Sequence, residues 1–229
     1  MVSQNTRDPV AFHQTFATAL FGLEWHDHLN NFISRQLTYR RSVRILKKVK
    51  QRVFKLGRFG DCLWNREKGR QVRVQLRSQM ENLAQGDVLI VDADGVEAFD
   101  YSFADEVFVK MVKTLVGEHP GRFVVIENLN DCTKENLTKA LENANLAMIE
   151  RCKGKLKLVG KVHPADEETF EQIAKSGEAA SAASLGRRLD MNLTAMNERL
   201  SKLTNLGVVR REKGSSASGR EQYVYHVLS

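Results

Sequence analysis

The fold of the chain's C-terminal part is decided by residues 182–212, which read AASLGRRLDMNLTAMNERLSKLTNLGVVRRE. Leu185 and Leu189 are four residues apart, which places them on one face of a helix. A turn follows, and apolar residues then recur at helical spacing over residues 193–206. Gly207 is placed to end this second helix with a positive φ. The stretch therefore predicts two helices joined by a tight turn.

The residues on either side extend this pair of helices into a larger unit. A short helix is predicted over residues 169–176, and two strands with alternating apolar residues over 208–213 and 220–228. The small residues GSSASG at 214–219 predict the tip of a hairpin between these strands. Helix, helix, turn, helix and hairpin is the order of a winged helix-turn-helix. We therefore expect an α+β winged helix over residues 164–229.

The same stretch resembles bacterial winged-helix transcription regulators in its pattern of Arg-Leu, turn, Thr-Ala and then RLxxLxxLGVV. The resemblance implies that the third helix binds the major groove of DNA and that the hairpin contacts the minor groove or the backbone. Asn can pair with adenine, Glu can accept from cytosine, and basic side chains supply salt-dependent contacts with phosphates. The predicted DNA contacts are Asn192, Thr194, Ala195, Asn197, Glu198, Arg199, Lys202, Arg210, Arg211, Lys213 and Arg220. Some winged helices bind only proteins, so a docking module is the alternative.

Strand and helix patterns alternate in the middle of the chain, which predicts an α/β domain with at least partly parallel pairing. The continuous apolar run VLIVD at 88–92 is typical of a strand that is covered on both faces. Strands are predicted at 71–76, 88–92, 123–126 and 155–162, and helices at 79–84, 102–116 and 133–148.

Residues 88–107, VLIVDADGVEAFDYSFADEV, resemble the STAS-like family of unknown function, which is related to the anti-sigma factor antagonist domain. REKGRQVR at 66–73 fits the start of the same domain. The resemblance implies a STAS-like α/β domain over 58–163 that docks a protein partner or another copy of the chain.

The loop before the 102–116 helix is a candidate switch or partner loop, made of Asp100, Tyr101, Ser102 and Asp105. In the antagonists a serine of this loop is phosphorylated, and Tyr101 stands at that position here, with Ser102 next. Ser followed by an acid three residues later resembles a capping box. We therefore predict that Ser102 caps the helix.

Residues 1–57 are predicted to form a helical N-terminal extension with a basic amphipathic helix from about Leu29 to Leu56. No acid occurs from residue 40 to residue 58. Such a helix is a nucleic-acid contact, a solvated or oligomer-packing face, or a membrane-surface helix. The candidate second basic contact consists of Arg40, Arg41, Arg44, Lys47 and Lys48.

The net charge of +7 is unevenly distributed, since an acidic middle at 78–180 lies between basic segments at 35–77 and 187–220. This asymmetry favours a polyanionic partner for some surfaces and another partner for the rest. The chain starts without a signal-peptide pattern and has no run long enough for a membrane helix, so we expect a cytoplasmic protein without membrane contact.

Motifs of common enzymes are absent from the sequence, and we expect no catalytic site, metal or cofactor. Cys62, Cys132 and Cys152 form no C-x-x-C pair, which argues against a zinc finger or a disulfide framework. The acids of the middle loop, Asp92, Asp94, Asp100, Asp105 and Glu106, are interpreted as turn and cap residues, with a Mg²⁺ site as the alternative.

Together these features predict a transcription regulator that binds double-stranded DNA as a homodimer or higher homo-oligomer. The STAS-like domain would bind a partner or mediate oligomerisation. The alternative is a partner-switching adaptor whose winged helix docks on a protein. A nucleic-acid enzyme that uses the acidic loop is a third class.

Overall fold

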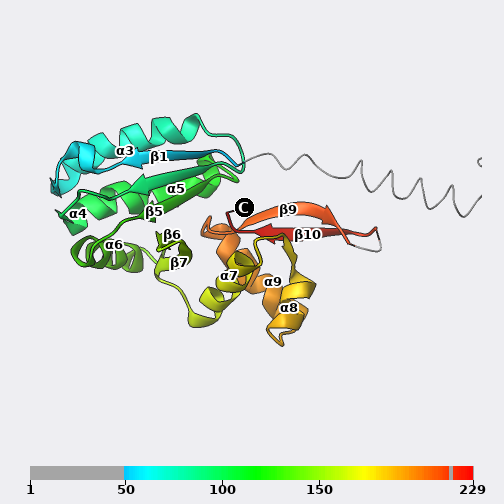
Figure 1. The fold of residues 1–229 in the computed structure, drawn as a ribbon. Helices are drawn as coiled ribbons and strands as arrows, with labels where there is room; N and C mark the ends of the chain where they lie inside the picture. Colours follow the sequence, from blue (N-terminus) through cyan, green and yellow to red (C-terminus); the bar gives the residue numbers. More distant parts are fainter. Residues whose placement is uncertain (1–48, 217–218, 229) are drawn as a thin grey trace, which may run out of the picture. The chain divides into compact units, whose positions relative to one another are not determined.

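The computed structural model describes residues 49–216 and 219–228 (Figure 1). Its centre is a five-stranded sheet with the order β1-β3-β5-β6-β7. The first four strands are parallel and β7 is antiparallel to β6. The strands are β1 (Gln51–Lys55), β3 (Val88–Asp92), β5 (Phe123–Glu127), β6 (Ala147–Cys152) and β7 (Lys155–Gly160). This mixed α/β fold with a mainly parallel sheet agrees with the α/β class expected for the middle of the chain.

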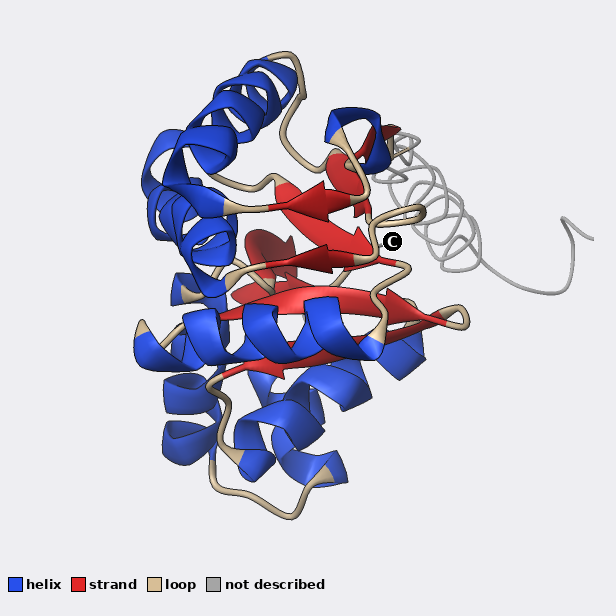
Figure 2. Cartoon of the chain, turned by 90° about the vertical axis from the view of Figure 1, so that its left-hand side faces the viewer, coloured by secondary structure: helices blue, strands red, loops and turns tan. Residues whose placement is uncertain are grey.

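Helices connect the parallel strands, as parallel pairing requires. They are α3 (Asn65–Glu81), α4 (Tyr101–Ala104), the π-helical turn η2 (Asp105–Val109), α5 (Lys110–Glu118) and α6 (Asp131–Asn143). The 3-10 turn η1 (Gly57–Phe59) and a small parallel pair, β2 (Cys62–Leu63) with β4 (Ala98–Phe99), complete this half. Figure 2 shows the strands in red with the helices in blue around them. Within the described residues, none of the helices is both long and apolar enough to cross a bilayer.

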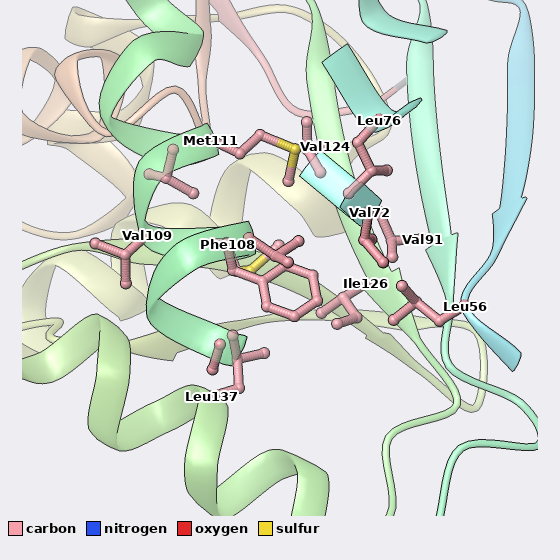
Figure 3. Packing of buried hydrophobic residues seen from close by; sticks show 14 of the residues in the cluster. Leu56, Val72, Leu76, Val91, Phe108, Val109, Met111, Val124, Ile126 and Leu137 are labelled. Atoms are coloured by element: carbon pink, nitrogen blue, oxygen red, sulfur yellow. The ribbon is translucent and has the colours of Figure 1, made fainter. Parts of the chain in front are cut away.

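One face of the sheet packs on these connecting helices. Leu89 and Val91 of β3 point to this side, as expected for alternate residues of a strand. Phe108 of η2 is fully buried, and Figure 3 shows it among side chains of α3, β3 and β5, such as Val72 and Ile126. The apolar positions of β3 and β5 thus form the base of the first core.

The C-terminal elements form a second group with its own small sheet. They are α7 (Pro164–Ser176), β8 (Ala180–Ser181), α8 (Ala182–Arg188), α9 (Leu193–Asn205), β9 (Arg210–Ser215) and β10 (Glu221–His226). The three strands pair antiparallel in the order β8-β10-β9. The predicted helix, helix, turn, helix and hairpin are all present, and α7 begins five residues earlier than expected because Pro164 and a cap from His163 start it.

The C-terminal elements also cover the second face of the large sheet. Val88 and Ile90 of β3, together with Val125 of β5, belong to one buried cluster with Phe170 of α7 and Leu200 of α9. These side chains are at most 2% exposed. The strands of the large sheet (residues 49–163, the α/β half) and the helices of residues 164–228 (the C-terminal half) therefore share a hydrophobic core. This explains why β3 is apolar at both its even and odd positions.

The strand predicted at 71–76 is wrong, because these residues lie inside α3. Val72 and Leu76 are buried, but Val74, which a strand would bury with them, is 65% exposed. The buried face continues to Gly69 and Met80, with the spacing of a helix.

The helix predicted from Leu29 to Leu56 is wrong at its C-terminal end. The prediction that region 1–57 is helical is wrong for the same residues. Residues 51–55 form β1, which pairs in parallel register with β3 from Gln51↔Val88 to Lys55↔Asp92. The heptad pattern placed Val53 in the apolar stripe, yet Val53 is 56% exposed and its neighbour Phe54 is buried. Hydrogen bonding to β3 makes this segment a strand, and the pattern of residues within the segment does not indicate that pairing.

The helix predicted at 133–148 is too long. It ends at Asn143, and Asn145, with φ of 53°, turns the chain into β6, where Met148 is buried. Lys153 and Gly154 both have positive φ, as a two-residue hairpin turn requires, and connect β6 to β7. The last strand was expected, but its antiparallel partner was not.

Candidate nucleic-acid interface

Helix α9 presents one face to the core and the opposite face to solvent. Met196, Leu200 and Leu203 are fully buried on the inner side. Asn192 is the N-cap, since its Oδ1 accepts a hydrogen bond from the backbone N–H of Ala195 at 2.8 Å. The Asn192 side chain therefore caps the start of α9, which is the role that its position before the apolar residues of the helix favours.

The outer face of α9 carries most of the polar residues predicted to contact DNA. Thr194, Asn197, Glu198 and Lys202 are exposed, and Ala195 is half-buried. Thr194 lies three and four residues before Asn197 and Glu198, and Glu198 lies four residues before Lys202, so these side chains are neighbours on one side of the helix. The face therefore combines amide, hydroxyl, carboxylate and ammonium groups on a helix whose other side is fixed by packing.

Arg199 does not belong to this outer face. Its Nη1 donates to the backbone oxygen of Ala165 at 3.1 Å, and the same nitrogen lies 3.5 Å from Thr169 Oγ1. Arg199 thereby joins α9 to the first turn of α7. We assign it to the packing of the two helices instead of to a contact with DNA.

The β9–β10 hairpin separates two of its arginines onto opposite faces. Arg211 pairs with Tyr225 and Lys213 with Tyr223 across the ladder, so these four side chains share one face. The Arg211 guanidinium lies 4.5 Å from the centroid of the Tyr223 ring, a cation–π contact. Burial raises the pKa of the Tyr225 hydroxyl at the base of this face. Arg211 and Lys213 are exposed, and the exposed Arg220 precedes β10.

Arg210 lies on the other face of the hairpin and is largely buried. Its Nη2 is 2.7 Å from Glu212 Oε1, and its side chain is 19% exposed. The Arg210 guanidinium lies so close to Gly86 of the α/β half that any side chain at residue 86 would clash with Arg210 Nη1. Arg210 therefore belongs to the seam between the two halves, and we do not group it with Arg211.

Two exposed cations that sequence reasoning missed lie at the end of α8. Arg187 and Arg188 occupy its last turn, where positive charge is favoured by the helix dipole. The sequence signal was present in the Gly-Arg-Arg triplet before the turn.

Two acidic residues of the candidate switch loop make contacts that stabilise the fold. Asp100, and not Ser102, caps α4, because its Oδ1 accepts from the backbone N–H of Phe103 at 2.7 Å. Asp105 forms an ion pair with Arg66 at 2.6 Å. Tyr101 is 37% exposed at the start of the helix. The prediction that Ser102 is the cap is wrong, since the carboxylate two residues earlier has the required extended backbone and reach.

Glu106 is a buried carboxylate surrounded by cations. Its side chain is 1% exposed, with Arg73 at 3.0 Å and Arg66 at 3.6 Å, and Lys110 is hydrogen-bonded to it. Burial raises the pKa of Glu106, but the hydrogen bonds from Lys110 and Arg73 outweigh this effect and hold the pKa below its ordinary value. The cluster ties α3 to η2 and α5.

The remaining acids do not gather around one point. Asp92 Oδ1 accepts from the backbone N–H of Asp94 at 2.9 Å and from Asn128 Nδ2 at 2.8 Å, in the manner of a turn carboxylate. Over residues 49–216 and 219–228, no group of three or more His, Cys, Asp or Glu is arranged to hold a metal ion. The second basic contact, from Arg40 to Lys48, lies outside the described residues.

Comparison with solved structures gives a weak likeness. No protein-family model matches the chain, and no curated protein matches it. Among solved structures it is similar to a "possible transcriptional regulator" from Methanosarcina mazei Go1, with 16% identity and a TM-score of 0.27. The alignment covers 30% of this chain and 57% of that one, so the chain spans little more than half the length of that structure.

Proposed function

We propose that the C-terminal half is a winged helix that binds double-stranded DNA and that the protein regulates transcription. In this proposal α9 enters the major groove, and the β9–β10 hairpin is the wing that contacts the backbone or minor groove. The α/β half is a STAS-like domain that mediates oligomerisation or binds a partner. The protein would be a homodimer, since winged-helix proteins often read paired half-sites.

The observation that carries the proposal is the composition of the exposed surface of this half. The outer face of α9 offers Asn197 and Glu198 for base edges, next to Thr194. Six exposed cations lie on α8, α9 and the hairpin, namely Arg187, Arg188, Lys202, Arg211, Lys213 and Arg220. These cations can neutralise phosphates, which supplies most of the affinity for DNA. The buried Met196 and Leu200 hold the helix rigidly behind them.

The test is to measure which genomic DNA fragments the purified protein retains at about 150 mM salt, where contacts that depend on charge alone are weakened. We expect recovery of a short site with two-fold symmetry. Asn197→Ala should lose preference at one base pair, by about 1–3 kcal/mol. Lys113→Ala is the matched control, because Lys113 is an exposed lysine of α5 in the other half. Retention of all fragments alike, or of none, would rule out the proposal.

A protein-docking function has one specific observation in its favour. Trp64 is 49% exposed and Tyr101 is 37% exposed. They lie at the ends of the paired strands β2 and β4, where Asp100 Oδ2 also accepts from the N–H of Asn65 at 3.2 Å. Exposed aromatic residues of this kind are typical of protein-interaction hot spots.

Sedimentation equilibrium tests whether this surface joins copies of the chain. If it does, Trp64→Ser should shift the wild-type oligomer to monomer, while Val74→Ser, a change of another exposed residue, should not. An unchanged oligomer in Trp64→Ser would exclude self-association through this surface.

A further inference from the structure

The seam between the two halves contains a cleft of about 210 Å³. One wall is formed by the end of α5 and the start of β5. The opposite wall is formed by the segment that joins α9 to β9. Leu115, Val116, Phe123 and Val209 contribute apolar surface to its walls. Gly207, with φ of 74°, brings the backbone close, since a Cβ there would lie 3.1 Å from Leu115. This volume is below the roughly 300–1,000 Å³ of pockets for drug-sized ligands, so the cleft suits only a compact molecule with one small ring.

The polar part of the lining is entirely cationic or neutral. Arg122, Arg210 and Arg211 line the cleft together with His119, and no Asp or Glu is among its lining residues. Arg122 Nε donates to the backbone oxygen of Leu83 at 2.8 Å, and its Nη1 lies 3.3 Å from His119 Nδ1. Burial lowers the pKa of His119, so the imidazole is neutral at pH 7 and can accept from Arg122.

The charge of these arginines is only partly balanced. Arg210 is paired with Glu212, yet its buried Nε has no hydrogen-bond partner. In the part of the chain that the structure describes, Arg122 and Arg211 have no carboxylate within ion-pair distance. Guanidinium groups in an apolar cleft bind carboxylates strongly, because the fork of donors matches the two carboxylate oxygens.

We propose that this cleft is a binding site for a small organic carboxylate, with the apolar body against Leu115, Val116 and Phe123 and the carboxylate toward Arg122 and Arg210. The site is formed by both halves of the described chain.

The experiment measures binding by isothermal titration calorimetry without DNA, so its outcome does not depend on DNA binding. Benzoate is the probe, and benzamide is the uncharged probe of the same shape. We expect saturable one-to-one binding of benzoate and at least about tenfold weaker binding of benzamide, as the loss of a charge-assisted contact implies. Equal binding of the two probes, or no binding of benzoate, would overturn the proposal.

Variants locate the binding in the cleft. Val116→Trp places a large side chain on an exposed helical position that lines the cleft, and it should abolish benzoate binding. Val74→Trp makes the same change on the exposed face of α3 and should leave binding unchanged. Arg122→Gln should weaken benzoate about tenfold and leave benzamide unaffected. Thermal unfolding confirms that each variant is folded, and wild-type affinity for benzoate in folded Val116→Trp would refute this location.

Discussion

The change Asp100→Ala removes a carboxylate that serves the starts of two helices. Oδ1 accepts from the N–H of Phe103 in α4 at 2.7 Å, and Oδ2 accepts from the N–H of Asn65 in α3 at 3.2 Å. Loss of an N-cap costs about 1 kcal/mol. The second, longer and exposed bond contributes about 0.5–1 kcal/mol more. We therefore expect the free energy of unfolding to fall by about 2 kcal/mol, with a midpoint about 4–8 °C lower.

Urea unfolding followed by circular dichroism measures this change, with two variants for comparison. Asp100→Asn should lose less than half of the effect, because asparagine is also a good N-cap and retains one oxygen. Ser102→Ala should stay within about 0.5 kcal/mol of the wild type, since Asp100 supplies the cap of α4. If Ser102→Ala is as destabilising as Asp100→Ala, the capping scheme described for this loop is wrong.

Four further substitutions test the packing and the pH dependence. Phe170→Ala, at a fully buried position of the shared core, should lower the free energy of unfolding by about 3–5 kcal/mol in urea titrations; a loss under 1 kcal/mol would contradict that burial. Gly69→Ala should lower the free energy of unfolding, although alanine usually favours helices, because the new Cβ would lie 2.9 Å from Glu106 Cβ. Gly117→Ala has open space around the new Cβ and should raise the free energy of unfolding by up to about 1 kcal/mol. Burial lowers the pKa of His119 below 6.5, so as the pH falls the histidine is protonated in the unfolded chain before it is protonated in the folded one. The free energy of unfolding should therefore decrease as the pH drops below 6.5. Unfolding measured from pH 7.5 to 5 should show that His119→Gln removes this contribution to the pH dependence.

The strands that the sequence predicts best are those whose residues are buried on both faces. Val88–Asp92 and Phe123–Glu127 are apolar at nearly every position, and this continuous pattern fits a strand covered on both sides. The error at 71–76 arose because Val72 and Leu76 are consistent with both a strand and a helix, since four residues is an even number and also about one helical turn. The segment Gln51–Lys55 was misassigned because its partner β3 is distant in sequence.

The candidate interface shows the same division between local and distant causes. The outer face of α9 could be predicted because Asn197 and Lys202 lie opposite apolar positions of the same helix. The hydrogen bond from Arg199 to the carbonyl of Ala165 could not be predicted, because this acceptor lies 34 residues away in sequence. The role of Arg210 in the seam depends on Gly86, and no pattern within β9 indicates it.

The core shared by the two halves limits how a signal can reach α9. Val88, Ile90, Phe123, Val125 and Ile149 of the large sheet are each at most 4% exposed in this core. Exposing all five would cost about 8–15 kcal/mol, from about 1.5–3 kcal/mol for each side chain. Allosteric coupling between two ligand sites is typically only about 1–3 kcal/mol. An effector therefore cannot act by swinging the halves apart, and regulation has to proceed through small displacements of side chains along an intact seam.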